Sequence, residues 1–133
     1  MSPTILSEAR GSLAPMPGIH HIALRVRDCE ISREFYEKAF GLETVKRSED
    51  NDVLRAVWLR AGPTILMLER AIRGAGSETG SGHVLIFEGT DLDAAETRLR
   101  EAGVAVVDRT ASTLYVTDPD GHRAGVSIHR FTL

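Results

Sequence analysis

The sequence has little of what builds covalent crosslinks, sulfur-rich metal centres or membrane spans. Cys29 is the only cysteine, so an intrachain disulfide and a cysteine-rich metal site are both excluded. No apolar run approaches the roughly 18 residues that a membrane-spanning helix needs. The opening stretch MSPTILSEARGSLAPMPG lacks the basic start and the continuous apolar segment of a signal peptide. We therefore expect a cytoplasmic protein with no membrane partner.

The chain also lacks a strong excess of either positive or negative charge. The chain carries 16 Lys and Arg against 19 Asp and Glu, and the two signs are interspersed along it. Without a basic stripe there is no electrostatic footprint for nucleic acid, so we expect no nucleic-acid partner. A hydrophobic content of 42% and a charged content of 26% are typical of one globular domain.

Two segments of the sequence follow the same plan. The first is HIALRVRDCEISREFYEKAFGLETV, from His21 to Val45, and the second is HVLIFEGTDLDAAETRLREAGVAVV, from His83 to Val107. Each begins as a strand and continues as a helix. Asp28 and Asp91 are good helix N-caps, because a carboxylate accepts hydrogen bonds from the free N–H groups of the first turn. Gly41 and Gly103 stand where a helix ends in a left-handed residue.

Further strands follow each helix, and turn residues separate them. We expect strands at Leu42–Ser48, Val53–Arg60, Thr64–Glu69, Val104–Asp108, Ser112–Thr117 and His122–His129. The Gly- and Ser-rich stretch RAIRGAGSETGSG separates the halves. The sequence thus predicts a flexible leader (1–18) and a single domain (19–133), with module one at 19–69, a linker at 70–82 and module two at 83–129. The fold class is α+β, with two tandem βαβββ modules forming a curved eight-stranded mixed sheet around a cup-shaped cavity.

Strand periodicity predicts which side chains face that cup. Since Ile22, Leu24 and Val26 form the apolar face toward the helix, His21 and Arg25 point into the cup. The same alternation sends Ile65, Met67 and Glu69 of Thr64–Glu69 to the cup. Arg123 takes the cup side of the last strand.

The first strand of module two is apolar on both faces, which weakens its alternation. There we expect His83, Leu85 and Phe87 on the cup side. If a pseudo-twofold axis relates the modules, His21 faces His83 and Met67 faces Gly125. The facing of Trp58 and Tyr115 does not follow from the pattern.

HHIALRVRDCEISREFYEKAFGLETV and VTDPDGHRAGV together resemble the vicinal oxygen chelate superfamily, which includes glyoxalases, bleomycin resistance proteins and extradiol dioxygenases. The resemblance extends from about Gly18 to His129. It implies the paired-module fold and, because small members are commonly dimers, a homodimer. It says little about which reaction is catalysed, since proteins with this fold carry out many different reactions.

The resemblance also implies where metal ligands would stand. The two family histidines fall on His21 and His83, whereas the two carboxylate positions fall on Met67 and Gly125. Without those acids, standard glyoxalase I activity is not expected. Glu69 lies two residues beyond Met67 on the same strand face and offers a replacement acid. His21, His83 and Glu69 would then form a site for divalent Fe, Mn, Ni or Zn; alternatively, Glu69 is a solvated strand-end residue.

Two functions remain open from the sequence, beside a third in which the domain has only an interaction role. One is a protein that binds a small organic ligand in the cup without a standard metal site. The other is a divalent-metal-dependent lyase, isomerase or dioxygenase that uses His21, His83 and Glu69. In either case Arg25 and Arg123 are candidates to hold an anionic group, and Met67 and Phe87 are candidate apolar walls. No catalytic residue is assigned.

Overall fold

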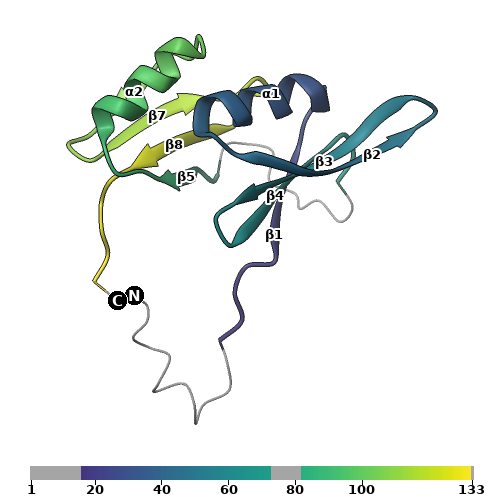
Figure 1. Cartoon of the computed structure of the whole chain (residues 1–133), viewed down its shortest axis with the longest axis horizontal. Coiled ribbons are helices and arrows are strands. Elements are labelled where there is room, and N and C mark those ends of the chain that lie inside the picture. The colour runs from purple at the N-terminus through teal and green to yellow at the C-terminus, as the bar shows by residue number, and fades with distance from the viewer. Residues whose placement is uncertain (1–15, 73–81, 133) are drawn as a thin grey trace.

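The computed structural model describes residues 16–72 and 82–132. It confirms the predicted α+β fold of two βαβββ modules (Figure 1). The elements of module one are β1 (His21–Arg25), α1 (Cys29–Phe40), β2 (Glu43–Asp50), β3 (Val53–Ala61) and β4 (Thr64–Glu69). Those of module two are β5 (Leu85–Glu88), α2 (Leu92–Glu101), β6 (Asp108–Arg109), β7 (Thr113–Thr117) and β8 (Arg123–Ser127). Within the described ranges, neither helix has the length and apolarity needed to cross a membrane. Most of the predicted leader and linker lies outside the described residues.

Both helices begin at the predicted aspartates. The Asp28 carboxylate accepts hydrogen bonds from the backbone N–H groups of Glu30 and Ile31, and Asp91 caps α2 in the same way. Helix α1 ends at Gly41, whose φ of 72° lies in the left-handed region that favours glycine. The Arg98 side chain of α2 lies against this end of α1, so the second helix covers the C-terminus of the first.

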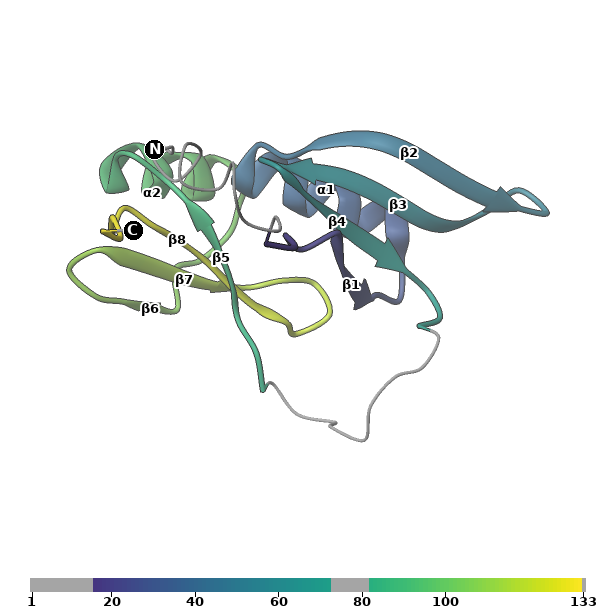
Figure 2. The ribbon, with the colours of Figure 1, turned by 90° about the horizontal axis from the view of Figure 1, so that it is seen from below.

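The eight strands form two sheets of four, in the orders β1-β4-β3-β2 and β5-β8-β7-β6. In each sheet the first strand runs parallel to its neighbour and the remaining pairs are antiparallel. Strands β1 and β5 are the edges of their own sheets and do not pair with each other (Figure 2). Within one chain, the expected eight-stranded sheet is therefore two separate halves.

Strand β6 is shorter than the predicted strand at Val104–Asp108. It comprises only two residues, because the preceding segment stays close to α2. The Val104 backbone N–H donates to the carbonyl of Leu99, and Val104 and Val106 pack against the core of module two. Apolar alternation alone did not distinguish this packed connection from a strand.

Each module has its own apolar core between helix and sheet. Leu24, Tyr36, Leu59 and Leu68 are fully or almost fully buried in module one, and Leu99, Leu114 and Val116 in module two. Phe35, Phe40 and Phe87 pack against both cores and join them. Figure 1 shows both helices along one side of the molecule, so the two sheets turn their other faces away from the helices.

The turn between β7 and β8 links the two modules. The Tyr36 hydroxyl on α1 donates a 2.7 Å hydrogen bond to Asp118, which is only 5% exposed. Asp120 accepts hydrogen bonds from the Ser32 hydroxyl and from the backbone N–H and Nε of Arg27. The aspartates of the Asp-Pro-Asp-Gly motif thus bind the first helix and the loop that precedes it.

Candidate functional site

We call the side of each sheet turned away from the helices its open face. In module one the register places this face in three rows across β1, β4, β3 and β2. The rows are His21–Ile65–Arg60–Glu43, Ala23–Met67–Trp58–Lys46 and Arg25–Glu69–Ala56–Ser48. The predicted alternation of β1 and β4 is confirmed, because Leu24, Leu66 and Leu68 are buried on the opposite side.

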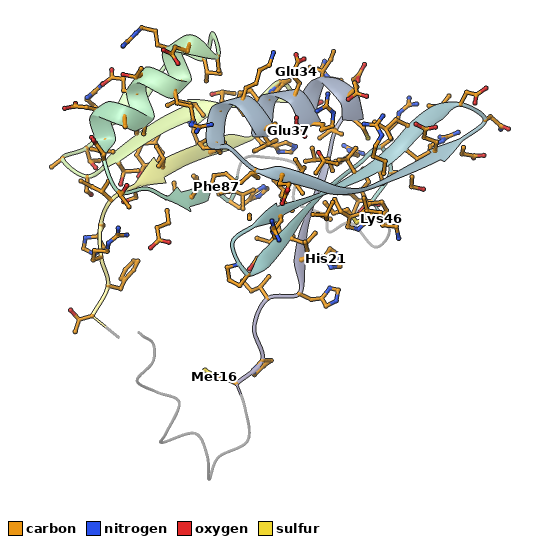
Figure 3. All side chains as sticks on the ribbon, in the orientation of Figure 1. Met16, His21, Glu34, Glu37, Lys46 and Phe87 are labelled. Atoms are coloured by element: carbon orange, nitrogen blue, oxygen red, sulfur yellow. The ribbon has the colours of Figure 1, made fainter. Side chains whose placement is uncertain are left out.

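The central row contains the side chains most suited to an organic ligand. Ala23 is small, Met67 is flexible and Trp58 presents a half-buried ring beside it. The Lys46 ammonium lies 4.7 Å from the centroid of the Trp58 ring, which is a cation–π contact. Figure 3 shows Lys46 and His21 on the side of the sheet opposite α1 and its Glu34 and Glu37. Trp58 and Lys46 were not predicted to belong to the site; the register with Met67 reveals them.

The matching row on the open face of module two is Ile86–Gly125–Tyr115–Asp108. Gly125 stands at the position that corresponds to Met67, as predicted. The backbone around it leaves no space for a side chain. A Cβ added to Gly125 would lie 2.4 Å from the carbonyl oxygen of Leu114 and 3.0 Å from the Ile86 side chain. The position at which the resemblance implies a glutamate is therefore closed by backbone.

The predicted facing of β5 is wrong. Leu85 and Phe87 pair in register with Ala124 and Val126, which are buried against α2, so both point toward the core. Phe87 packs on Phe40 with ring centroids 4.5 Å apart and also meets Tyr36. Ile86 instead occupies the open face and is 44% exposed. Because this strand is apolar on both sides, its pattern did not determine its orientation.

Because β5 faces the other way, His83 is not the structural counterpart of His21. His21 lies two residues before Ala23, and the residue two before Ile86 in module two is Val84. The His21 ring is hydrogen-bonded to His20, with the two Nδ1 atoms 2.9 Å apart. The His83 ring lies 6.0 Å from that of His122, whose Nε2 donates to the carbonyl oxygen of Arg25. In the part of the chain described, no three His, Cys, Asp or Glu side chains gather where they could hold one metal ion.

The remaining candidates are divided between the two open faces. Arg25 and Glu69 are register neighbours in module one, whereas Arg123 lies on β8 opposite Thr117. Cys29 is buried at the start of α1, where burial raises the pKa of its thiol and its Sγ contacts the carbonyl of Leu68. A thiol in this state is a packing group rather than a nucleophile.

A groove of about 800 Å³ runs between the two modules. Its walls include Phe40 and Leu42 after α1, Ile65 on β4, and Leu85 and Phe87 on β5. The ion-paired side chains Glu43 and Arg60 lie at its rim. Its volume and apolar walls are those of a small-molecule pocket, and Phe87 reaches it from the core side.

Family assignment rests on the whole plan of the chain. Residues 18–126 match the family model described as Glyoxalase/Bleomycin resistance protein/Dioxygenase superfamily. The chain belongs to this superfamily. The matched residues include both helix caps, the Tyr36–Asp118 junction and Gly125, so the departures from the metal-ligand pattern occur inside the matched region.

Individual relatives carry different functions. The chain is 27% identical over 115 residues to the metallothiol transferase FosB of Bacillus licheniformis, an alignment covering 80% of this chain and 71% of that protein. The fosfomycin resistance protein FosX of Mesorhizobium loti superposes with a TM-score of 0.71 at 20% identity, covering 88% of this chain and 95% of that one. TnmS3, an antibiotic binding protein from a Streptomyces species, superposes with a TM-score of 0.65 at 21% identity, covering 86% and 97%. The two structural similarities show a shared fold.

The residues of this chain do not fit the metal centre that the family resemblance implies. A divalent ion with nitrogen and oxygen ligands needs several donors converging on one point. Here Met67 and Gly125 replace the acids, and the backbone around Gly125 excludes any side chain. His21 lies beside His20 and His83 beside His122, and among the described residues no third ligand joins either pair. No reaction step is therefore derived through a metal.

Proposed function

We propose that this protein binds a small organic ligand over the central row of module one, without a standard family metal site. The observation that carries the proposal is Gly125, where a Cβ would lie 2.4 Å from the Leu114 carbonyl oxygen. A carboxylate cannot be supplied from this position unless the backbone moves. Met67, which stands at the other acid position, is apolar, and this suits an organic ligand better than an ion.

We further propose that a second copy of the chain completes the cup as a homodimer. The open faces of the two modules belong to separate sheets, and within residues 16–72 and 82–132 these sheets end at the edge strands β1 and β5. Apolar side chains cluster near these edges, with Ile19 at 64%, Val84 at 43% and Ile86 at 44% exposure. Exposed apolar patches of this kind favour protein contacts. With a twofold axis, the open face of module one would meet the open face of module two of the partner, bringing Arg25 and Arg123 to one cavity.

The alternative of a metal-dependent enzyme uses His21, His83 and Glu69. The name of the Bacillus relative, metallothiol transferase, makes it the natural competitor. In the dimer described above, His21 and a partner histidine would come from different subunits. The enzyme alternative requires a bound divalent metal ion, whereas the ligand-binding proposal does not, so metal content distinguishes the two.

Metal analysis of the purified dimer separates them. We expect protein prepared without chelator and offered Mn²⁺, Fe²⁺, Ni²⁺ or Zn²⁺ to hold far less than one ion per chain. We also expect apolar and aromatic compounds in a thermal-shift library to raise the melting temperature saturably. Stoichiometric metal that is lost in both His21→Ala and His83→Ala would establish the enzyme alternative. A library without a single stabilising compound would refute ligand binding, and a monomer by light scattering would refute the shared cup.

A further inference from the structure

We infer that the ligand of module one is a planar aromatic anion, held with its ring on Trp58 and its negative group at Lys46. The inference rests on the proposed function, because it names the chemical class for the same open face. It is carried by the register of the sheet, which places these two side chains at the end of one apolar row.

The aromatic part of the ligand follows from the shape of the central row. Ala23, Met67 and Trp58 are successive neighbours on β1, β4 and β3, so a small side chain, a flexible thioether and a flat indole form one continuous strip. Aromatic rings stack on indole in offset or edge-on geometry. The thioether adapts to the outline of a bound ring, and sulfur–aromatic contacts are favourable. Because Ala23 has only a methyl group, the strip rises less above the sheet at β1 than it does at β3.

The negative part follows from the distribution of charge on the open face. Lys46 and Arg25 form no ion pair with a carboxylate among residues 16–72 and 82–132. Other basic side chains of module one do form such pairs: Arg27, Arg33, Lys38, Arg47, Arg55 and Arg60.

Within the three rows, the cations Arg25, Lys46 and Arg60 outnumber the carboxylates Glu43 and Glu69. The chain as a whole has a net charge of −3, so this positive excess is a local property of the face. Arg60 pairs with Glu43, and Arg25 is the register neighbour of Glu69. Lys46 and Arg25 are therefore the cations of this face without an ion-paired carboxylate among the described residues, and of the two only Lys46 lies in the apolar central row.

Lys46 is positioned for this role before any ligand arrives. Its ammonium lies over the indole, 4.7 Å from the ring centroid, although the residue is exposed to solvent. A ligand ring that stacks on Trp58 brings a carboxylate, sulfonate or phosphate on that ring to within reach of the same ammonium. A charge-assisted hydrogen bond then replaces the cation–π contact. A cationic ligand would instead meet the charge of Lys46 and be repelled.

Three small probes separate the two parts of the inference. We use 4-nitrobenzoate as planar anion, 4-nitrobenzamide as its neutral counterpart and cyclohexanecarboxylate as a non-aromatic anion. Affinity is measured by calorimetry at low and high salt on the purified full chain. Trp58 is the only tryptophan in the sequence, so quenching of its emission reports binding at this row.

The variants are Lys46→Met, Trp58→Leu and the control Lys38→Met. Lys38 is on α1, where it pairs with Glu34 and lies on the opposite side of the sheet. Circular dichroism and melting temperature verify that each variant is folded. Lys46 and Trp58 lie outside the buried core, so we expect folded variants.

We expect 4-nitrobenzoate to bind roughly tenfold more tightly than the amide, the effect of one hydrogen bond to a charged group. Lys46→Met should bring this ratio close to one while leaving amide binding unchanged, and Lys38→Met should leave the ratio intact. Trp58→Leu should weaken both aromatic probes, and cyclohexanecarboxylate should bind more weakly than 4-nitrobenzoate. High salt should weaken only the anions.

Several results would overturn the inference, and they differ from a failure of the proposed function. Equal affinity for carboxylate and amide, or a ratio that survives Lys46→Met, would show that the ligand is not recognised as an anion. Equal binding of cyclohexanecarboxylate, or no effect of Trp58→Leu, would show that no ring stacks on this row. If library compounds stabilise the protein but none of these probes binds, the ligand class is wrong and ligand binding stands. If nothing binds at all, the proposed function itself fails.

Discussion

The Tyr36 hydroxyl donates a 2.7 Å hydrogen bond to the Asp118 carboxylate, joining the first helix of module one to the closing turn of module two. Both groups are buried, and Asp118 also accepts hydrogen bonds from the backbone N–H groups of Asp120 and His122. The same carboxylate therefore shapes its own turn and fastens that turn to the other module. This contact therefore joins the two modules, beside the packing of Phe35, Phe40 and Phe87.

Replacing Tyr36 by Phe should lower the free energy of unfolding by about 1–3 kcal/mol, since it leaves a buried carboxylate without one partner. Urea denaturation followed by circular dichroism measures the change. Tyr115→Phe is the matched control, because Tyr115 lies on the open face of module two. An unchanged midpoint in Tyr36→Phe would contradict the role given to the contact.

Stability should also fall at alkaline pH in a way that depends on Tyr36. Burial, followed by the neighbouring charge of Asp118, raises the pKa of the Tyr36 hydroxyl above its ordinary value. The folded chain therefore holds this proton more tightly than the unfolded chain, whose tyrosines titrate near pH 10. The stabilisation is complete below about pH 10 and is lost as the pH rises above it. Urea titrations between pH 8 and 11 should show a steeper loss in wild type than in Tyr36→Phe.

Asp120→Ala should weaken the junction more than Arg27→Ala does. Asp120 is largely buried and accepts from both Ser32 and Arg27, whereas the Arg27 side chain is 83% exposed. An exposed ion pair contributes about 0–1 kcal/mol, so most of the effect should belong to the aspartate. We expect a loss of about 1–2 kcal/mol for Asp120→Ala. Equal losses in the two variants would instead assign the stabilisation to the ion pair.

Gly125→Ala should destabilise the protein by about 1–3 kcal/mol, because the new Cβ meets backbone that cannot move aside easily. Gly18→Ala is the control, since nothing lies within 4 Å of a Cβ built there. Gly125→Glu should be at least as destabilised and should not acquire metal. Stoichiometric metal in folded Gly125→Glu would contradict the view that this position is closed.

The facing of β5 gives a further prediction. Phe87→Ala should cost about 2–4 kcal/mol, since the ring joins the two cores. Ile86→Ala on the neighbouring open face should cost much less, because 44% of that residue is exposed. Chemical denaturation of the two variants tests the orientation directly. A larger loss in Ile86→Ala would restore the facing expected from the sequence.

Interactions between residues close in sequence determined much of the secondary structure of this protein. The repeated strand–helix pattern, the caps at Asp28 and Asp91 and the glycine at the end of α1 depend on neighbouring residues, so they are legible in the sequence. The facing of β1 was equally clear, because one side of it is apolar and the other carries His21 and Arg25. In each case one residue type satisfies a requirement that its own segment creates.

Tertiary structure decided what depends on contacts between distant segments. Strand β5 is apolar on both sides, so only packing against Phe40 and α2 selects the side that is buried. Trp58 and Lys46 join Met67 through the register of three strands, which no single stretch of sequence contains. The sequence by itself determined that Gly125 brings no acid to the site. Only the fold, with the Leu114 carbonyl against it, determined that no acid fits there.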